Sequence, residues 1–156
     1  MNLRRAIVAG LAASIVMGMI EMVYEGLAGA GFWSPLVFIG ATVLRGLQSV
    51  QVPVSFHPAG VVLGLMGHMM NSALFGILFG WIVSRAAMSR GRLLQAGALY
   101  GLVIFLVMWY AVVPALDPVM LNLNGVVFAI AHVVWGAVLG LAVPQALRTG
   151  EGLQAA

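Results

Sequence analysis

The sequence predicts an all-α membrane protein built as a bundle of four transmembrane helices. The first observation is composition: 63% of the 156 residues are hydrophobic, only 7% are charged, and the mean hydropathy is +1.10. Roughly a quarter of the residues of a soluble protein are charged, so most of this chain's surface must face lipid. The second observation is a set of four long apolar windows, and the third is the placement of the arginines between them.

The four windows are each long enough to cross a membrane. An α-helix crosses the hydrocarbon layer of a bilayer, about 30 Å thick, with about 20 apolar residues at 1.5 Å each. Windows of this length run over 6–30, 59–84, 93–113 and 125–147, and the last three contain no charged residue. The sequence therefore predicts four spans in a single transmembrane domain covering 1–156.

The first window also has features of a secretory signal peptide. Arg4 and Arg5 precede an apolar stretch that ends in the small residues 28–30, which is the usual order of such a leader. Glu21 and Glu25 would be unusual so close to the apolar stretch of a signal peptide. We therefore expect this segment to be retained as a span.

Six of the seven arginines fall on one side of the membrane if every window spans. By the positive-inside rule this side is the cytoplasm. We therefore expect a multi-pass protein of a bacterial-type inner membrane with both termini in the cytoplasm. Arginines in this role do not indicate a nucleic-acid surface, and the lipid bilayer is the expected partner. The six are Arg4, Arg5, Arg85, Arg90, Arg92 and Arg148.

The segment 31–58 between the first two windows is too long for a tight hairpin and too apolar for a free loop. It predicts a short helix that lies in the outer membrane interface. At its end, His57 is expected to cap the second span, and Pro58 suits the first turn, where its missing N–H costs nothing. Asp117, which precedes Pro118, is expected to form a turn.

A weak internal repeat links the second and fourth windows. Both open with Gly-Val-Val, at Gly60 and Gly125, and both place a histidine near the eighth position, His68 and His132. The pattern is compatible with two related helical hairpins, and equally with the shared composition of membrane helices.

Glycines recur at four-residue spacing in three windows. Small residues at this spacing let helix backbones approach closely in lipid, where van der Waals packing drives helix association. We therefore assign them to helix packing rather than to chemistry. The glycines are Gly64, Gly76, Gly80, Gly97, Gly101, Gly136 and Gly140.

Three windows carry ionisable groups at one common depth. Glu21, His68 and His132 lie about 10 to 14 Å inside the outer boundary at 1.5 Å per residue, and Glu25 lies one turn further out on the face of Glu21. Because an ionised group in hydrocarbon is costly, such groups pair or neutralise each other. We expect both carboxylates to face the two imidazoles, which makes this layer the candidate functional site.

Several functions are compatible with this polar layer. In the first, its contacts fasten a bundle that serves as a small subunit or scaffold of a larger membrane complex, such as a respiratory one, with protein partners or as a homo-oligomer. The chain has little mass outside the predicted spans, so we expect no enzyme activity on its own. In the second, the layer relays protons or ions in a small transporter, because buried groups can change protonation near neutral pH.

A third function is cofactor binding. His68 and His132 could supply both axial ligands of a b-type haem, with Gly64, Gly67 and Gly136 making room for the macrocycle. The two histidines together with Glu21 and Glu25 would instead be an ordinary ligand set for a transition metal such as zinc, iron or manganese.

A fourth function is binding of Cu(I) by methionine thioethers beside the polar layer. Methionine is more commonly a filler of apolar cores. The methionines concerned are Met17, Met19, Met22, Met66, Met69 and Met70.

The chain has no cysteine, which excludes disulfides, iron–sulfur clusters and a cysteine nucleophile. It also has no phosphate-binding loop and no zinc-protease helix.

One series of proline, histidine, glycine and aromatic residues runs through the last three windows. It consists of Pro58-Ala59-Gly60, then His68 and Ser72, then Gly97 to Pro114 with Trp109 and Tyr110, and then His132 to Gly140. In this pattern the chain resembles small bacterial inner-membrane proteins of the YagU type. The resemblance implies a four-span inner-membrane protein and no particular reaction.

Overall fold

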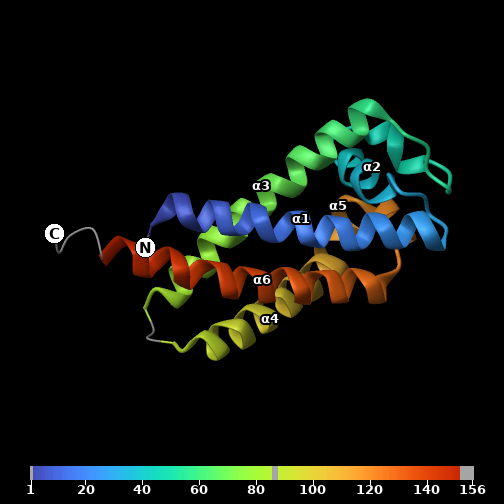
Figure 1. Cartoon of the computed structure of the whole chain (residues 1–156). Coiled ribbons are helices and arrows are strands. Elements are labelled where there is room, and N and C mark those ends of the chain that lie inside the picture. The colour runs from blue at the N-terminus through green and yellow to red at the C-terminus, as the bar shows by residue number, and fades with distance from the viewer. Residues whose placement is uncertain (1, 86–87, 152–156) are drawn as a thin grey trace.

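The chain folds entirely into helices over the residues that the computed structural model describes, which are 2–85 and 88–151, with side chains described up to residue 143. Four long helices are apolar enough to cross a membrane, and they confirm the predicted all-helical architecture with four candidate spans. Shorter helices connect them (Figure 1). The elements are α1 (Leu3–Ala28), α2 (Ser34–Ala41), α3 (Pro58–Val83), α4 (Arg90–Val107), α5 (Val113–Leu116) and α6 (Gly125–Glu151).

Three of the long helices begin before the predicted windows, and a polar residue caps each of them. Asn2 accepts a hydrogen bond from the backbone N–H of Arg5 through its side-chain oxygen, 3.3 Å away, so α1 begins at Leu3. Ser89 caps α4 through the N–H of Arg92. Side-chain acceptors at this position satisfy N–H groups that have no partner within the helix. His57 caps α3 by accepting from Gly60 N–H through Nδ1, at 3.0 Å, as predicted.

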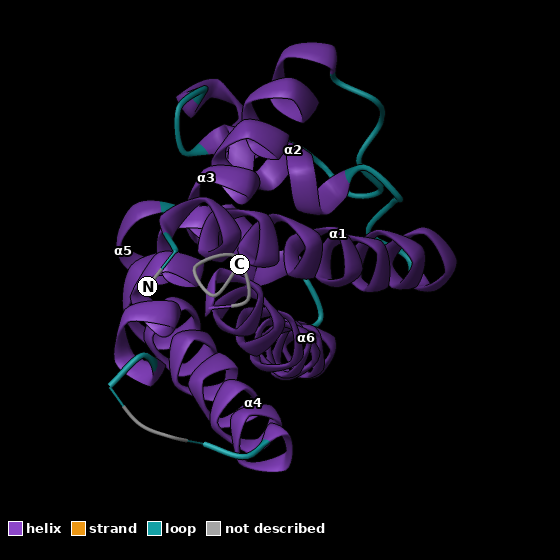
Figure 2. Cartoon of the chain, turned by 60° about the vertical axis from the view of Figure 1, so that its left-hand side comes forward, coloured by secondary structure: helices purple, strands orange, loops and turns teal. Residues whose placement is uncertain are grey.

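The long helices lie in the order α3, α1, α6, α4 (Figures 1 and 2). The two central helices are the more buried: 39% and 44% of the apolar windows of α1 and α6 are buried, against 22% and 17% for α3 and α4. The two outer helices, α3 and α4, hardly touch each other. The bundle therefore has three packed helix interfaces and one open side.

The interface between α4 and α6 is a contact between backbones. A Cβ added at Gly97 would overlap the carbonyl oxygen of Gly136, and one added at Gly136 would overlap that of Gly97. Gly101 lies in the same way against the carbonyl of His132, and Gly140 against that of Leu93. Small residues make this close approach possible.

The interfaces of α3 are also built on glycine. A Cβ at Gly76 would come within 2.8 Å of the carbonyl oxygen of Ala6 on α1, and Gly80 is buried on the same helix. Gly64, however, lies against the backbone of Leu36 in α2 rather than against another long helix. The glycines of α3 thus allow close packing against α2 at Gly64 and against α1 at Gly76.

The short helix expected between the first two spans is present as α2. Seven of its eight residues are buried, with Val37 and Phe38 fully enclosed. A helix that is apolar on all sides is buried rather than laid along a surface, because it has no polar face to turn outward. The helix therefore fills a groove beside α3, and its position in a membrane interface stays a prediction.

The last turns of the α4 segment change geometry. One π-helical turn, Met108–Val112, follows α4, and the N–H of Val113 bonds to the carbonyl of Met108. Proline has no N–H to continue an α-helical ladder, so Pro114 leaves the carbonyl of Tyr110 without its usual donor. The wider turn accommodates this break and leads directly into α5.

The helix contacts match the predicted relation between two hairpins only in part, because α1 packs on α3 as α4 packs on α6. If α1 corresponded to α4 and α3 to α6, the close contact of α1 with α6 would have its equivalent in a contact of α4 with α3. That second contact is the open side of the bundle. The origin of the chain from two related hairpins stays a prediction.

Candidate functional site

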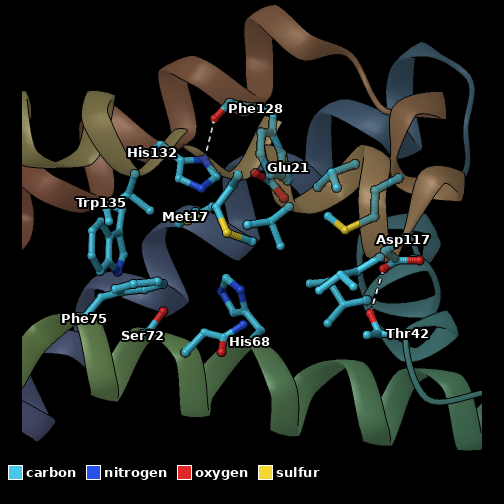
Figure 3. A pocket seen from close by; sticks show the side chains of 18 residues that line it. Met17, Glu21, Thr42, His68, Ser72, Phe75, Asp117, Phe128, His132 and Trp135 are labelled. Carbon is cyan, nitrogen blue, oxygen red and sulfur yellow. Dashed lines mark hydrogen bonds between the residues drawn. The ribbon is translucent and has the colours of Figure 1, made fainter. Parts of the chain in front are cut away.

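A cavity of about 390 Å³ lies within the bundle, beside its open side. Side chains from α1, α2, α3, α6 and the segment from α4 to α5 line it (Figure 3). Most of the lining is apolar, and seven of the eighteen lining residues carry polar side chains. The lining residues are Met17, Glu21, Ile39, Thr42, His68, Asn71, Ser72, Phe75, Ile104, Met108, Val112, Val113, Leu116, Asp117, Met120, Phe128, His132 and Trp135.

Three of the four ionisable residues singled out from the sequence line this cavity. Glu21, His68 and His132 come from α1, α3 and α6, and each is at most 9% exposed. Their arrangement around one space is visible in Figure 3. Equal depth on three helices brings side chains together only if each helix turns the relevant face inward, and here all three do.

Both histidines are held by backbone carbonyls. The Nε2–H of His68 donates to the carbonyl oxygen of Ser14 on α1, at 3.0 Å. The Nδ1–H of His132 donates to the carbonyl oxygen of Phe128, one turn back on α6, at 2.8 Å. Because a carbonyl oxygen only accepts, these contacts fix which ring nitrogen carries a proton. Nδ1 of His68 and Nε2 of His132 are left as acceptors.

One carboxylate oxygen of Glu21 is buried without a hydrogen-bond donor among the described residues. Its side chain is 4% exposed, and no described residue donates a hydrogen bond to Oε1. The described residues also form no ion pair between Glu21 and either histidine, although pairing across the bundle was expected. A buried carboxyl group without a partner is costly, so such a group calls for an explanation.

Glu25 serves a different purpose from Glu21. Its Oε1 accepts a hydrogen bond from the backbone N–H of Asn124, at 3.0 Å, immediately before α6 begins. Asn124 in turn caps α6 by accepting from the N–H groups of Val126 and Val127. Glu25 therefore fastens the start of α6 to α1 and does not line the large cavity.

The expected metal site is not formed among the described residues, since no three of their His, Asp and Glu side chains are grouped to hold an ion. The glycines expected to make room for a haem lie against other parts of the protein. Leu36 lies against Gly64, Ile39 lies 3.3 Å from the position of a Cβ at Gly67, and Gly97 lies against Gly136. These glycines pack against protein, so they provide no room for a macrocycle.

The methionines do not gather into a copper site. Met17 is buried and lines the cavity, whereas Met66 and Met70 are more than 60% exposed on the outside of α3. Met69 accepts a hydrogen bond from the hydroxyl of Ser14 at its sulfur, 3.1 Å away. The exposed methionines face outward because α3 buries only one narrow face, which carries its glycines and His68.

Asp117 forms a second polar group that the sequence did not reveal. Its carboxyl group accepts hydrogen bonds from Thr42, at 2.8 Å, and from the side-chain amide of Gln48. Arg45 donates to the carbonyl of Leu116 at 2.7 Å. Together these contacts tie the segment after α2 to the end of α5, and we call them the Asp117 clasp.

The environment of Asp117 has opposing effects on its acidity. Burial raises its pKa above the ordinary value of 3.8, while the hydrogen bonds from Gln48 and Thr42 and the charge of Arg45 act in the opposite direction. Two features of the sequence pointed to this contact: the acidic Asp117 between Leu116 and Pro118, and the polar Gln48 in the connection between the first two spans. Neither showed that residues 69 positions apart would meet.

The cavity ends at an apolar cluster toward the chain termini. Phe79, Leu139 and Val143 belong to this cluster, and Trp135 lies between it and the cavity. At the same level the hydroxyl of Tyr100 donates to the carbonyl oxygen of Phe75, at 3.1 Å, which joins α4 to α3. The polar side chains that line the cavity, which we call its polar floor, thus lie in one half of the bundle.

Comparison with protein-family models, with curated protein sequences and with solved structures finds no match to this chain.

Proposed function

We propose that this chain is an integral membrane protein that binds a small amphipathic molecule in the cavity between α3 and α4. The observation that carries the proposal is the cavity itself: about 390 Å³, largely apolar, and lined by Glu21, whose Oε1 has no hydrogen-bond partner among the described residues. Binding sites for small molecules have volumes of about 300 to 1,000 Å³ and combine apolar walls with a few placed polar groups.

The ligand would reach the cavity from the lipid. The lining residues of the open side come from α3 and α4, which hardly touch, and Asn71 is exposed there. Tyr100 bridges these helices at one end of the opening, and the Asp117 clasp closes the other end. An amphipathic molecule in the membrane would place its apolar part in this gap and its polar head against Glu21.

The proposed orientation in the membrane follows the arginines. Arg4, Arg90 and Arg92 are exposed near the beginnings of α1 and α4, at the end of the bundle where both helices start. Arg85, after α3, lies over the ring of Trp81 at 3.8 Å from its centre. A cation stacked on an exposed aromatic ring suits a membrane interface. We propose that this end faces the cytoplasm of a bacterial-type cell.

Other functions have less support than ligand binding. A relay across the membrane would need polar groups beyond the floor of the cavity, where the described residues form the apolar cluster around Phe79 and Leu139. A role as a subunit or scaffold of a larger complex stays a prediction, as does the resemblance to YagU-type proteins.

Filling the cavity tests this function. Ile104 lines the cavity on α4, whereas its neighbour Val103 is 47% exposed on the outside of the same helix. Binding of radiolabelled 4-phenylbutan-1-ol to protein in lipid nanodiscs is measured by equilibrium dialysis, with protein-free nanodiscs as background. We expect saturable one-to-one binding that Ile104→Trp abolishes and Val103→Trp preserves. Saturable binding that Ile104→Trp leaves unchanged, or equal loss in both variants, would refute the proposal.

A further inference from the structure

We infer that the head group of the bound molecule is an organic ammonium ion, with Glu21 as its counter-charge. The inference rests on the proposed binding function and names the class of ligand. It follows from three features of the lining: the sign of its charges, its aromatic rings and its free acceptor atoms.

The lining is acidic and contains no basic side chain that is permanently charged. Glu21 and Asp117 contribute carboxyl groups, and neither arginine nor lysine is among the lining residues. Asp117 already has two donors in the clasp, while Oε1 of Glu21 has none. A cation bound beside Glu21 would supply the partner that this buried carboxyl group lacks. An anionic head group would instead meet a carboxylate.

Aromatic rings line the cavity on two sides (Figure 3). Phe75 and Trp135 form one wall of the cavity, with ring centres 6.5 Å apart, and Phe128 lies on the side of Glu21 (Figure 3). The faces of aromatic rings attract organic cations, and the attraction is strongest where water is excluded. A carboxyl group combined with several rings therefore favours an ammonium ion over a neutral head group of the same size.

The histidines add acceptors rather than positive charge. Nδ1 of His68 and Nε2 of His132 remain available because the opposite nitrogens donate to backbone carbonyls. A primary ammonium group has three N–H donors, so it could bond to Glu21 and to one ring nitrogen at the same time. An alcohol has one donor and would leave at least one acceptor without a partner.

A bare metal ion fits the same lining poorly. Metal ions in proteins need several converging ligands, and the described His, Asp and Glu side chains form no group of three. The walls are mostly apolar, which suits a carbon skeleton attached to the charge. The cavity thus favours an organic cation over an inorganic one.

Three probes of equal length and different charge test the inference. The binding of 4-phenylbutylamine, 4-phenylbutan-1-ol and 4-phenylbutyrate to the protein in nanodiscs of neutral lipid is compared by equilibrium dialysis at neutral pH. The amine is then protonated, because the pKa of an alkyl ammonium is roughly 10.4. We expect the ammonium to bind more tightly than the alcohol and the carboxylate to bind least. Protein-free nanodiscs correct for partition of each probe into lipid.

Substitution of Glu21 separates charge recognition from binding. In Glu21→Gln, the ammonium is expected to bind weaker by roughly tenfold to a hundredfold, because one partner of a buried ion pair is lost. Binding of the alcohol should change little. Glu25→Gln is the matched control: it makes the same chemical change one turn away and keeps the acceptor for Asn124, so the preference for the ammonium should persist.

The outcomes distinguish the two proposals. If the alcohol binds in the cavity as tightly as the ammonium, or if Glu21→Gln leaves the preference unchanged, the ammonium inference is wrong and the binding function stands. If no probe binds saturably, or if the binding observed is unchanged by Ile104→Trp, both proposals are wrong.

Discussion

Nε2–H of His68 on α3 donates a hydrogen bond to the backbone carbonyl of Ser14 on α1, at 3.0 Å, within the bundle. The contact joins helices that are 54 residues apart in sequence and turns the other ring nitrogen away from α1. One side chain thus serves both the packing of α1 with α3 and the lining of the cavity.

His68→Ala is expected to reduce the free energy of unfolding by about 1 to 3 kcal/mol, because a buried hydrogen bond and part of the packing are lost. The measurement is unfolding by SDS in mixed micelles, followed by circular dichroism. Asn71→Ala is the control on the same helix, since Asn71 is exposed and its change should stay within about 0.5 kcal/mol. Equal stability of His68→Ala and the parent protein would contradict the structural role of this contact.

Gly101→Ala is expected to destabilise the protein by about 1 to 3 kcal/mol or more, because the new methyl group would overlap a backbone carbonyl that cannot move aside. That carbonyl belongs to His132, so separation of α4 from α6 would also disturb the cavity floor. The same unfolding assay measures the effect.

Gly91→Ala is the matched control for Gly101→Ala. Gly91 lies in the same helix, and a Cβ there meets nothing within 4 Å. Alanine favours helix over glycine by up to about 1 kcal/mol, so this variant should be neutral or slightly stabilised. If both variants behaved alike, the close contact of α4 with α6 would be wrong.

Asp117→Asn is expected to remove a pH-dependent part of the stability. Because burial raises the pKa of Asp117 above 3.8, the folded state holds this proton more tightly than the unfolded state. Its contribution to stability is therefore fully present below about pH 3.8 and is lost as the pH rises through the folded-state pKa. Asparagine carries no charge, so the variant should gain stability relative to the parent protein as the pH rises. Thermal unfolding from acidic to neutral pH measures this difference, and a constant difference would contradict the prediction.

The orientation of the bundle can be tested by thiol labelling, because the chain has no cysteine of its own. Ser49 and Gly91 are exposed near opposite ends of the bundle. In right-side-out membrane vesicles, Ser49→Cys should react with an impermeant maleimide, and Gly91→Cys should react only after permeabilisation. The reverse pattern would invert the orientation, and equal labelling of both would contradict a spanning arrangement between them.

The helices were predictable because length and hydropathy act locally. An apolar window of 20 residues flanked by arginine or a capping residue has few alternatives to a membrane-crossing helix. The common depth of Glu21, His68 and His132 was equally accessible, since it follows from counting residues along each helix. These are properties of single segments.

The partners of each side chain were not predictable in the same way. Depth along an axis does not set the rotation of a helix or the identity of its neighbours, which depend on how the glycine faces meet. Glu25 therefore accepts a hydrogen bond from Asn124 rather than pairing with a histidine, and Gly64 packs against α2 rather than beside a haem. The Asp117 clasp depends on a contact between distant segments that no local pattern encodes.

The π-helical turn Met108–Val112 has a consequence for how the cavity wall tolerates changes in chain length. The hydrogen bond that closes a π-helical turn spans one residue more than the bond that closes an α-helical turn. Deleting that residue would close a regular α-helical turn and keep the segments on either side in register. Deleting a residue from the regular part of α4 would instead rotate everything beyond it by about 100°. Val113 and Asp117 would then leave the positions that they hold in the cavity and the clasp. A one-residue deletion is therefore a smaller perturbation within this turn than in the helix that precedes it.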